Sequence, residues 1–201
     1  MANKYSWRWV AVVNIGFICE GFTEALILES ENFNRILEDY NLKNVGLVNV
    51  RGNGNLLPHR ILQYKEFLFD EGASKIFILT DLDQDDCITK TKLRITESPN
   101  QIIIIAVKQI ESWFLADNKT MSKILDEDFV FEFPENENTP IETIRKIHFE
   151  KFKRGIIGKD EKIRLARKML KNGFSIQNAA NHPNCPSAKY FLTKLQSIVN
   201  N

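Results

Sequence analysis

Apolar and polar positions along the first part of the chain predict strands and helices in alternation. Four short runs are rich in β-branched residues and predict buried strands: Val10–Cys19, Asn44–Val50, Lys75–Thr80 and Gln101–Val107. Apolar side chains at helical spacing predict a helix over residues 24–38, and Pro58 and Gly72 bound another over Pro58–Asp70. A polar helical stretch that breaks near Pro99 and a helix that begins at Glu111–Ala116 complete the alternation. This alternation predicts the α/β class: a Rossmann-like, mainly parallel sheet flanked by helices on both faces.

The pattern changes after residue 117. Residues 127–139 are acidic and contain Pro134, which favours a loop, whereas residues 141–171 are basic and predict helix. Gly173 supplies a helix stop, and Pro186 fits the first turn of a last helix that ends near Val199. We therefore expect an α/β core over residues 1–120 and a helical, basic C-terminal extension over residues 121–201 that packs on it.

Composition narrows the class of protein further. Hydrophobic residues make up 43% and charged residues 26% of the chain, which is a globular mixture. The formal net charge of +1 neither favours nor excludes a polyanionic partner. The three cysteines are widely spaced and form no CxxC pair, so we expect neither a zinc site nor disulfides, but a reducing, cytoplasmic location. Every apolar run is shorter than the ~20 residues that cross a bilayer, so no membrane contact is expected.

Carboxylates gather where the predicted strands end, which is where ligands bind in open α/β sheets. Glu20 ends the first strand and Glu24 lies in the first turn of the next helix, so both can face one site. Asp81 and Asp83 follow the third strand, and alternate residues of an extended segment point the same way. Such oxygen ligands suit Mg²⁺ or Mn²⁺.

Each of these acids also has a plainer interpretation. Glu24 can be a favourable first-turn acid, Glu20 an exposed strand end, and a DxD pair a solvated loop. A calcium-binding EF-hand is a poor alternative, because Asp86 stands where that loop needs Gly and Lys92 where it needs Glu.

Three segments resemble a known family. Residues 19–24, Cys-Glu-Gly-Phe-Thr-Glu, resemble the EGxTE signature of TOPRIM domains, and Asp81-Leu82-Asp83 resembles their DxD signature. Residues 108–117, Lys-Gln-Ile-Glu-Ser-Trp-Phe-Leu-Ala-Asp, resemble an IExWxxAD segment of small OLD-like TOPRIM proteins. A weaker similarity lies in residues 185–189, Cys-Pro-Ser-Ala-Lys.

The resemblance implies a TOPRIM fold and a metal-dependent nuclease that cleaves phosphodiester bonds in DNA or RNA, with a link to phage defence in some members. It implies that Glu20 is a metal ligand or general base and that Lys189 stabilises the transition state. It further implies metal ligands at Glu24, Asp81, Asp83 and Glu111. Metal ions activate water and screen phosphate, and a lysine neutralises developing charge. No GxxxxGK[ST] motif occurs, so a separately encoded ATPase partner, or none, remains open.

The basic segment suggests where nucleic acid would bind. Residues 143–171 hold eleven Lys and Arg, with Phe149 and Phe152 between them, as in phosphate-tracking surfaces. The candidate contacts are Lys153, Arg154, Lys159 and Arg164. The alternative is a solvated helix face opposite a core-facing apolar stripe.

Two other classes of function stay open. A haloacid-dehalogenase-like phosphatase would use Asp81 as nucleophile and Asp83 as acid, which leaves Glu20 and Glu24 unexplained. A non-catalytic module would bind nucleic acid or an ATPase and use a metal only structurally, since a fold does not guarantee activity.

Overall fold

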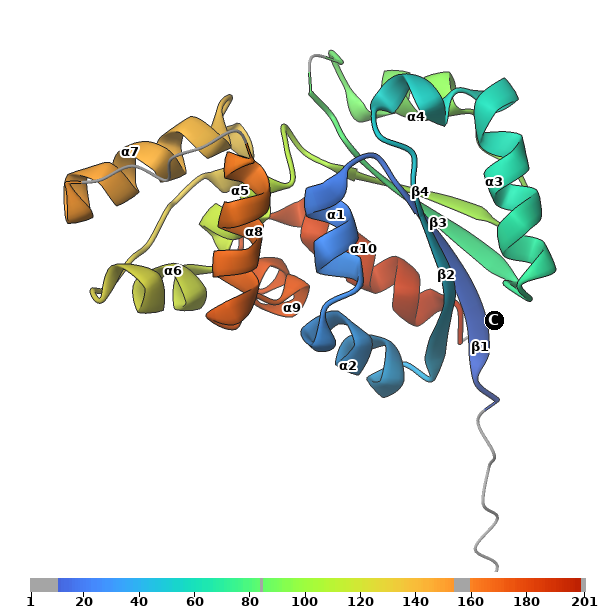
Figure 1. Cartoon of the computed structure of the whole chain (residues 1–201), viewed down its shortest axis with the longest axis horizontal. Helices are drawn as coiled ribbons and strands as arrows, with labels where there is room; N and C mark the ends of the chain where they lie inside the picture. The colour runs from blue at the N-terminus through green and yellow to red at the C-terminus, as the bar shows by residue number, and fades with distance from the viewer. Residues whose placement is uncertain (1–10, 84, 154–159, 200–201) are drawn as a thin grey trace, which may run out of the picture.

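A computed structural model describes residues 11–83, 85–153 and 160–199. Four parallel strands form one sheet in the order β2-β1-β3-β4 (Figure 1). They are β1 (Val13–Cys19), β2 (Leu42–Asn49), β3 (Lys75–Asp81) and β4 (Gln101–Ala106). The predicted α/β class with a parallel sheet between helices is confirmed.

The strands are apolar on both faces because helices cover both. Phe17 and Phe77 point to one face, while Ile18 and Ile78 point to the other. The first face is covered by α1 (Phe22–Leu28), α2 (Glu31–Asp39) and α10 (Pro186–Ser197), and the second by α3 (Pro58–Asp70) and α4 (Ile88–Ile95) (Figure 1). This double cover explains the nearly continuous apolar runs in the sequence.

Helix α3 approaches the sheet closely over two glycines. A Cβ atom on Gly46 would lie 2.7 Å from Cδ2 of Leu68, and one on Gly16 would lie 3.2 Å from the same side chain. Leu68 is fully buried. The missing side chains on β1 and β2 therefore provide the space that this leucine fills.

The order of the strands places a crevice at the carboxyl ends of β1 and β3. From β1 the chain runs through α1 and α2 to β2, and α3 then carries it across the opposite face to β3, on the other side of β1. The connections thus leave in opposite directions between β1 and β3, which is where open α/β sheets bind ligands. Glu20 follows β1 and Asp81 ends β3 at this point.

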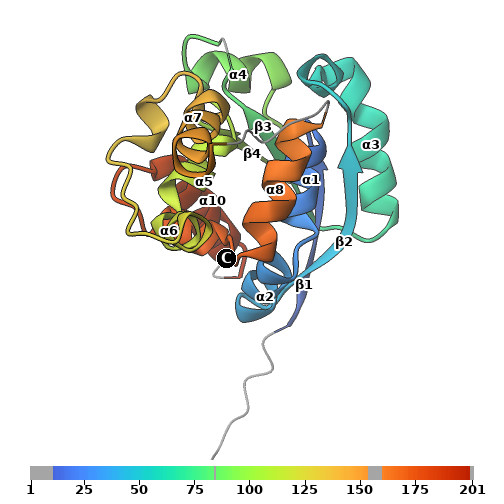
Figure 2. The same ribbon diagram turned by 60° about the vertical axis from the view of Figure 1, so that its left-hand side comes forward.

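Helices after β4 complete one face of the same core. They are α5 (Glu111–Ala116), α6 (Asn118–Leu125), a 3₁₀ turn (Pro134–Asn136), α7 (Pro140–Phe152), α8 (Glu161–Lys171), α9 (Ile176–Ala180) and α10. The ring of Phe191 on α10 lies 6.5 Å or less, between centroids, from Phe17, Phe77 and Trp113. Helix α8 packs beside α1 (Figure 2). Residues on both sides of position 120 therefore share one hydrophobic cluster.

The helices differ from the prediction in three places. The single helix expected over residues 24–38 is two, because Ser30 caps α2 by accepting a hydrogen bond from the backbone N–H of Phe33. Helices α6 and α9 were not predicted; Asp117 and Ser175 cap them. The basic stretch 141–171 contains two helices, α7 and α8. Within the described ranges, no helix is long and apolar enough to cross a bilayer.

Candidate functional site

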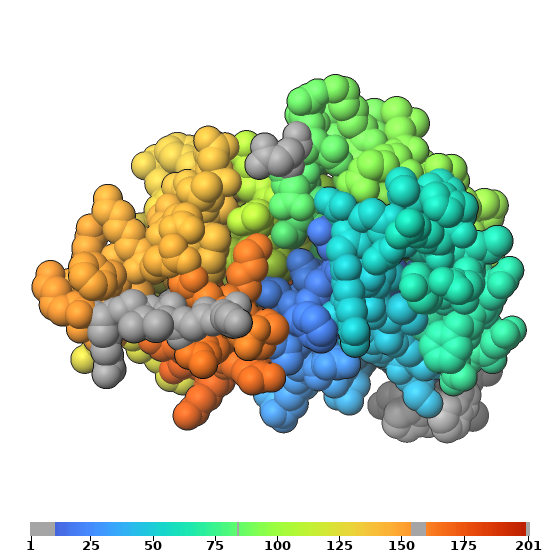
Figure 3. Space-filling view, turned by 45° about the horizontal axis from the view of Figure 1, so that its top comes forward, coloured from blue at the N-terminus to red at the C-terminus, as the bar shows by residue number. Residues whose placement is uncertain are grey.

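A cavity of about 520 Å³ opens between the carboxyl ends of β1 and β3 and the start of α8. Figure 3 views the face where α8 borders the segment that joins β1 to α1. Among the described residues, the lining contains six acidic side chains and two basic ones, so negative charge prevails there. The lining residues are Glu20, Gly21, Phe22, Thr23, Glu24, Arg51, Gly52, Asp81, Glu111, Asp160, Glu161, Lys162 and Ile163.

Glu20 and Asp81 are tied together across the two central strands. Oε2 of Glu20 accepts a hydrogen bond of 2.5 Å from the hydroxyl of Thr80 and one of 3.3 Å from the backbone N–H of Asp81. Oδ1 of Asp81 accepts a hydrogen bond of 2.8 Å from the backbone N–H of Ile110, just before α5. The carboxylates are therefore held by the ends of the strands rather than by a mobile loop.

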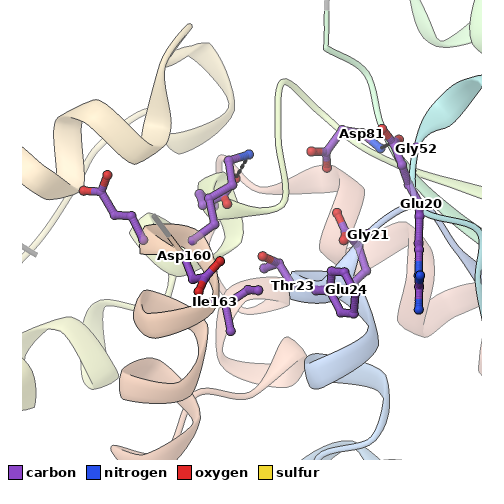
Figure 4. A pocket seen from close by; sticks show the side chains of 13 residues that line it. Glu20, Gly21, Thr23, Glu24, Gly52, Asp81, Asp160 and Ile163 are labelled. Carbon is purple, nitrogen blue, oxygen red and sulfur yellow. Dashed lines mark hydrogen bonds and ion pairs between the residues drawn. The ribbon is translucent and has the colours of Figure 1, made fainter. Parts of the chain in front are cut away.

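Glu24 and Glu111 reach the same cavity from α1 and α5 and are buried, with 5% and 0% of their surface exposed. A Cβ atom on Gly21 would lie 2.9 Å from Oε2 of Glu24. The backbone of Gly21 is extended, with φ −143°, a conformation that any residue adopts. The structural role of Gly21 is therefore to leave room for the Glu24 carboxylate. Figure 4 shows Glu24 and Asp81 facing Asp160 and Ile163 of the α8 side.

Burial and mutual repulsion favour the protonated form of these acids. Burial, and then the charges of Glu111 and Glu20, raise the pKa of Glu24 from 4.5 to about 7. Burial also raises the pKa of Asp81 well above its ordinary value, and Glu24 and Glu111 add to the effect. Burial raises the pKa of Glu111, although Lys162 opposes it. The cavity thus favours protons or another cation.

Lys162 is the cation that meets these carboxylates. Its Nζ lies 3.3 Å from Oε2 of Glu111, with 44% of the lysine side chain exposed and none of the glutamate. Burial alone would lower the pKa of Lys162, but the charges of Glu111, Asp81 and Glu24 raise it. Oε1 of Glu111 is buried and has no hydrogen-bond partner among the described residues. One lysine therefore leaves part of this negative charge unmet.

The donor set fits a hard divalent cation such as Mg²⁺ or Mn²⁺. Carboxylate oxygens are its preferred ligands, and the unpartnered Oε1 of Glu111 is one available donor. In the described ranges, no three Asp, Glu, His or Cys side chains lie close enough to hold an ion as they stand. Ligation would therefore require side chains such as Glu24 and Glu111 to shift toward one point.

The acidic run after β3 separates into different environments. Asp83 adopts a left-handed conformation with φ 48°, so it does not continue an extended segment from Asp81, and it lies outside the described lining of the cavity. Asp85 accepts hydrogen bonds from Thr91 (2.8 Å) and Arg94 (3.1 Å) at helix α4. The backbone turn at Asp83 removes the extended segment from which a shared direction of Asp81 and Asp83 was predicted, while the charge of Asp83 still raises the pKa of Glu111.

The predicted basic residues that the structure describes are not among the lining residues of the cavity. Lys189 is exposed on α10 and, in the described part of the chain, is not a lining residue. Lys153, at the end of α7, and Arg164, on α8, are exposed. Arg154 and Lys159 lie outside the described residues. Other cations of the basic segment form ion pairs between elements: Arg145 with Glu161, and Lys151 with Glu127.

Sequence reasoning missed Lys162 as a site residue. It was one of eleven cations in a basic segment, and its partner Glu111 is 51 positions away. Its local signal is its place in the first turn of α8, a position that seldom carries a cation because the helix dipole disfavours it.

Comparison of the chain with the descriptions of known protein families, with curated proteins and with solved structures finds no match. The function is therefore argued from the site itself.

Proposed function

We propose that this protein is a metal-dependent, TOPRIM-type nuclease that hydrolyses phosphodiester bonds of DNA or RNA with Mg²⁺ or Mn²⁺. One observation carries the proposal. Glu20, Glu24, Asp81 and Glu111 come from three separate stretches of the chain and line one cavity at the β1–β3 edge, with more negative charge than Lys162 offsets. Four buried or half-buried acids at one point are costly for the fold, which favours a role in binding a cation.

Differences in burial suggest separate roles for the four acids. When bound, the metal would supply screening of the phosphate charge and a lowered pKa for water. Glu24, Asp81 and Glu111 are buried and would hold the cation, whereas Glu20 is partly exposed and can accept a proton from water. Lys162, with its side chain 44% exposed, can place its ammonium beside a phosphate oxygen.

The phosphatase alternative has less support. It needs an acid at Asp83, which lies outside the described lining of the cavity, and it gives no task to Glu20 and Glu24, which line it. Trapping of a phosphate on Asp81 would reverse this preference.

Incubation of the protein with single- and double-stranded DNA and RNA, in Mg²⁺, Mn²⁺ or EDTA, tests the proposal. We expect cleavage that EDTA abolishes and that Asp81→Asn lowers at least ~100-fold, the range typical of lost catalytic groups. Asparagine can still accept the hydrogen bond from Ile110, so the fold should persist. Asp86→Asn, in the same acidic run but exposed and paired with Lys90, is the matched control.

Cleavage that persists in EDTA, or in Asp81→Asn at the wild-type rate, would contradict the proposal. If no nucleic acid is cleaved and Mg²⁺ and Mn²⁺ leave the thermal stability unchanged, a non-catalytic binding module is the better description.

A further inference from the structure

An aromatic ring and a guanidinium lie together at the mouth of the acidic cavity. Phe22, the first residue of α1, lines the cavity and is 52% exposed. The guanidinium carbon of Arg51 lies 5.7 Å from the centroid of the Phe22 ring. Arg51 is also exposed and lines the cavity. The two side chains thus form a flat, partly apolar and cationic rim beside the carboxylates.

The backbone holds Arg51 at this rim in an unfavourable conformation. Arg51 has φ 58°, in the left-handed region that residues with a Cβ rarely adopt. Its N–H donates to Oδ1 of Asn49 (2.9 Å), and the N–H of Gly52 donates to the carbonyl of Glu20 (2.8 Å). Gly52 has φ 122°, which favours glycine. Strain of this kind gathers at functional sites. The hydrogen bond from Gly52 places the neighbouring Arg51 beside the segment that carries Glu20.

We infer that Phe22 and Arg51 form a subsite for an unpaired nucleobase and its phosphate, so the substrate is single-stranded nucleic acid. This inference rests on the proposed action on nucleic acid. Aromatic side chains stack any base, and arginine contributes both stacking and phosphate contact. Holding a base between the two groups requires roughly 7–8 Å, two contacts of ~3.5–4.0 Å. The distance between the Arg51 guanidinium and the Phe22 ring is 5.7 Å, and the exposed Arg51 side chain can widen it by rotating outward.

Duplex substrates fit this rim poorly. The faces of paired bases are stacked on their neighbours, so Phe22 could reach a base only after it leaves the stack. Among the described lining residues, six are acidic, one of them (Glu161) paired with Arg145, and two are basic, which disfavours the dense phosphates of a duplex. A single strand can instead place one phosphate near these cations and turn one base toward the ring.

Binding of a fluorescent single-stranded oligonucleotide, followed by anisotropy in EDTA, tests the subsite without turnover. We expect Phe22→Ala to weaken binding about 5- to 150-fold, the equivalent of ~1–3 kcal/mol per stacked base, and Phe22→Trp to restore it. Arg51→Gln should weaken binding and reduce its salt dependence. Phe67→Ala is the matched control, because Phe67 is 50% exposed on α3 and does not line the cavity in the described chain.

Equal binding by Phe22→Ala and wild type, or equal affinity for the duplex and its single strand, would overturn the inference. If Phe22→Ala cleaves nucleic acid in Mg²⁺ as fast as wild type, the subsite is rejected and the proposed nuclease activity is supported. Loss of single-strand binding in Phe22→Ala, without cleavage of any nucleic acid by wild type, would support the subsite and reject the nuclease.

Discussion

Replacing Glu24 with glutamine should stabilise the metal-free protein at alkaline pH. Glu24 is 5% exposed, and its pKa in the folded protein is about 7, compared with an ordinary 4.5. Below pH 4.5 the carboxyl is neutral in both the folded and unfolded states, so the shift contributes nothing. As the pH rises from 4.5 to about 7, the unfolded state ionises while the folded state keeps its proton, so the folded protein loses stability until its own carboxyl ionises above about 7. A difference of about 2.5 pKa units corresponds to at most about 3 kcal/mol.

Glutamine keeps the shape of the side chain and removes the charge. In EDTA, the free energies of unfolding of Glu24→Gln and wild type should nearly coincide at pH 4.5. At pH 8 the variant should be more stable by up to about 3 kcal/mol, or roughly 6–12 °C in Tm for a chain of this size. Urea titrations and calorimetry at both pH values measure the difference. Glu66→Gln, on the exposed surface of α3, should change stability by less than ~0.5 kcal/mol.

Addition of Mg²⁺ or Mn²⁺ extends the same experiment. A metal at 100 times its Kd stabilises the protein that binds it by about 2.7 kcal/mol, so wild type should gain stability at pH 8 and Glu24→Gln should gain much less. Wild type should gain less at pH 5, where protons compete for the carboxylates. The reasoning is refuted if Glu24→Gln is less stable than wild type at pH 8 in EDTA, because the buried charge would then be stabilising.

Three further variants test separate parts of the structure. Lys162→Met should lower the free energy of unfolding in EDTA at pH 8 by about 1–3 kcal/mol, because Glu111 loses its partner. The loss should be smaller at pH 5. An equal loss at both pH values in urea titrations would contradict the ion pair. Asp117→Ala should lower the free energy of unfolding by about 2–4 kcal/mol, more than the loss of an ordinary N-cap. The reason is that this buried carboxylate caps α6 and also accepts hydrogen bonds from Ser175 and Asn178. A calorimetric loss below ~1 kcal/mol would count against that role. Gly46→Val should cost about 1–3 kcal/mol by displacing the buried side chain that packs over it, and an unchanged urea midpoint would show that α3 has room to move.

Local patterns predicted the sheet and two helices closely, because their causes are local. The four predicted strands match β1 to β4 with small differences at their ends, and α3 (Pro58–Asp70) and α5 (Glu111–Ala116) have the predicted bounds. The break at Ser30 was missed because apolar spacing continues across it, and only the cap separates α1 from α2. α6 and α9 are short, and their caps, Asp117 and Ser175, could have been read from the sequence.

The site was predictable where strand ends, and the first turn of the helix that follows a strand, determine it, as for Glu24. Parallel strands bring their carboxyl ends to one edge, so the approach of Glu20 to Asp81 follows from the order of elements. The direction of Asp83 depends on a backbone turn that the DxD spacing does not encode. The pairing of Lys162 with Glu111 depends on how α8 packs beside α1, a tertiary contact that periodicity cannot reveal.

The position of Lys162 also has a consequence for how the protein is made. Translation produces the strands and Glu20, Asp81 and Glu111 before it produces α8, which carries the lysine. A growing chain that has assembled its sheet would hold these acids and Glu24, four in all, without their counter-charge, and this long-range contact closes late in folding. Until residue 162 emerges, protons or divalent cations would have to offset this charge, and one apolar face of the sheet still awaits α10, so the domain should become stable only after both helices have been made.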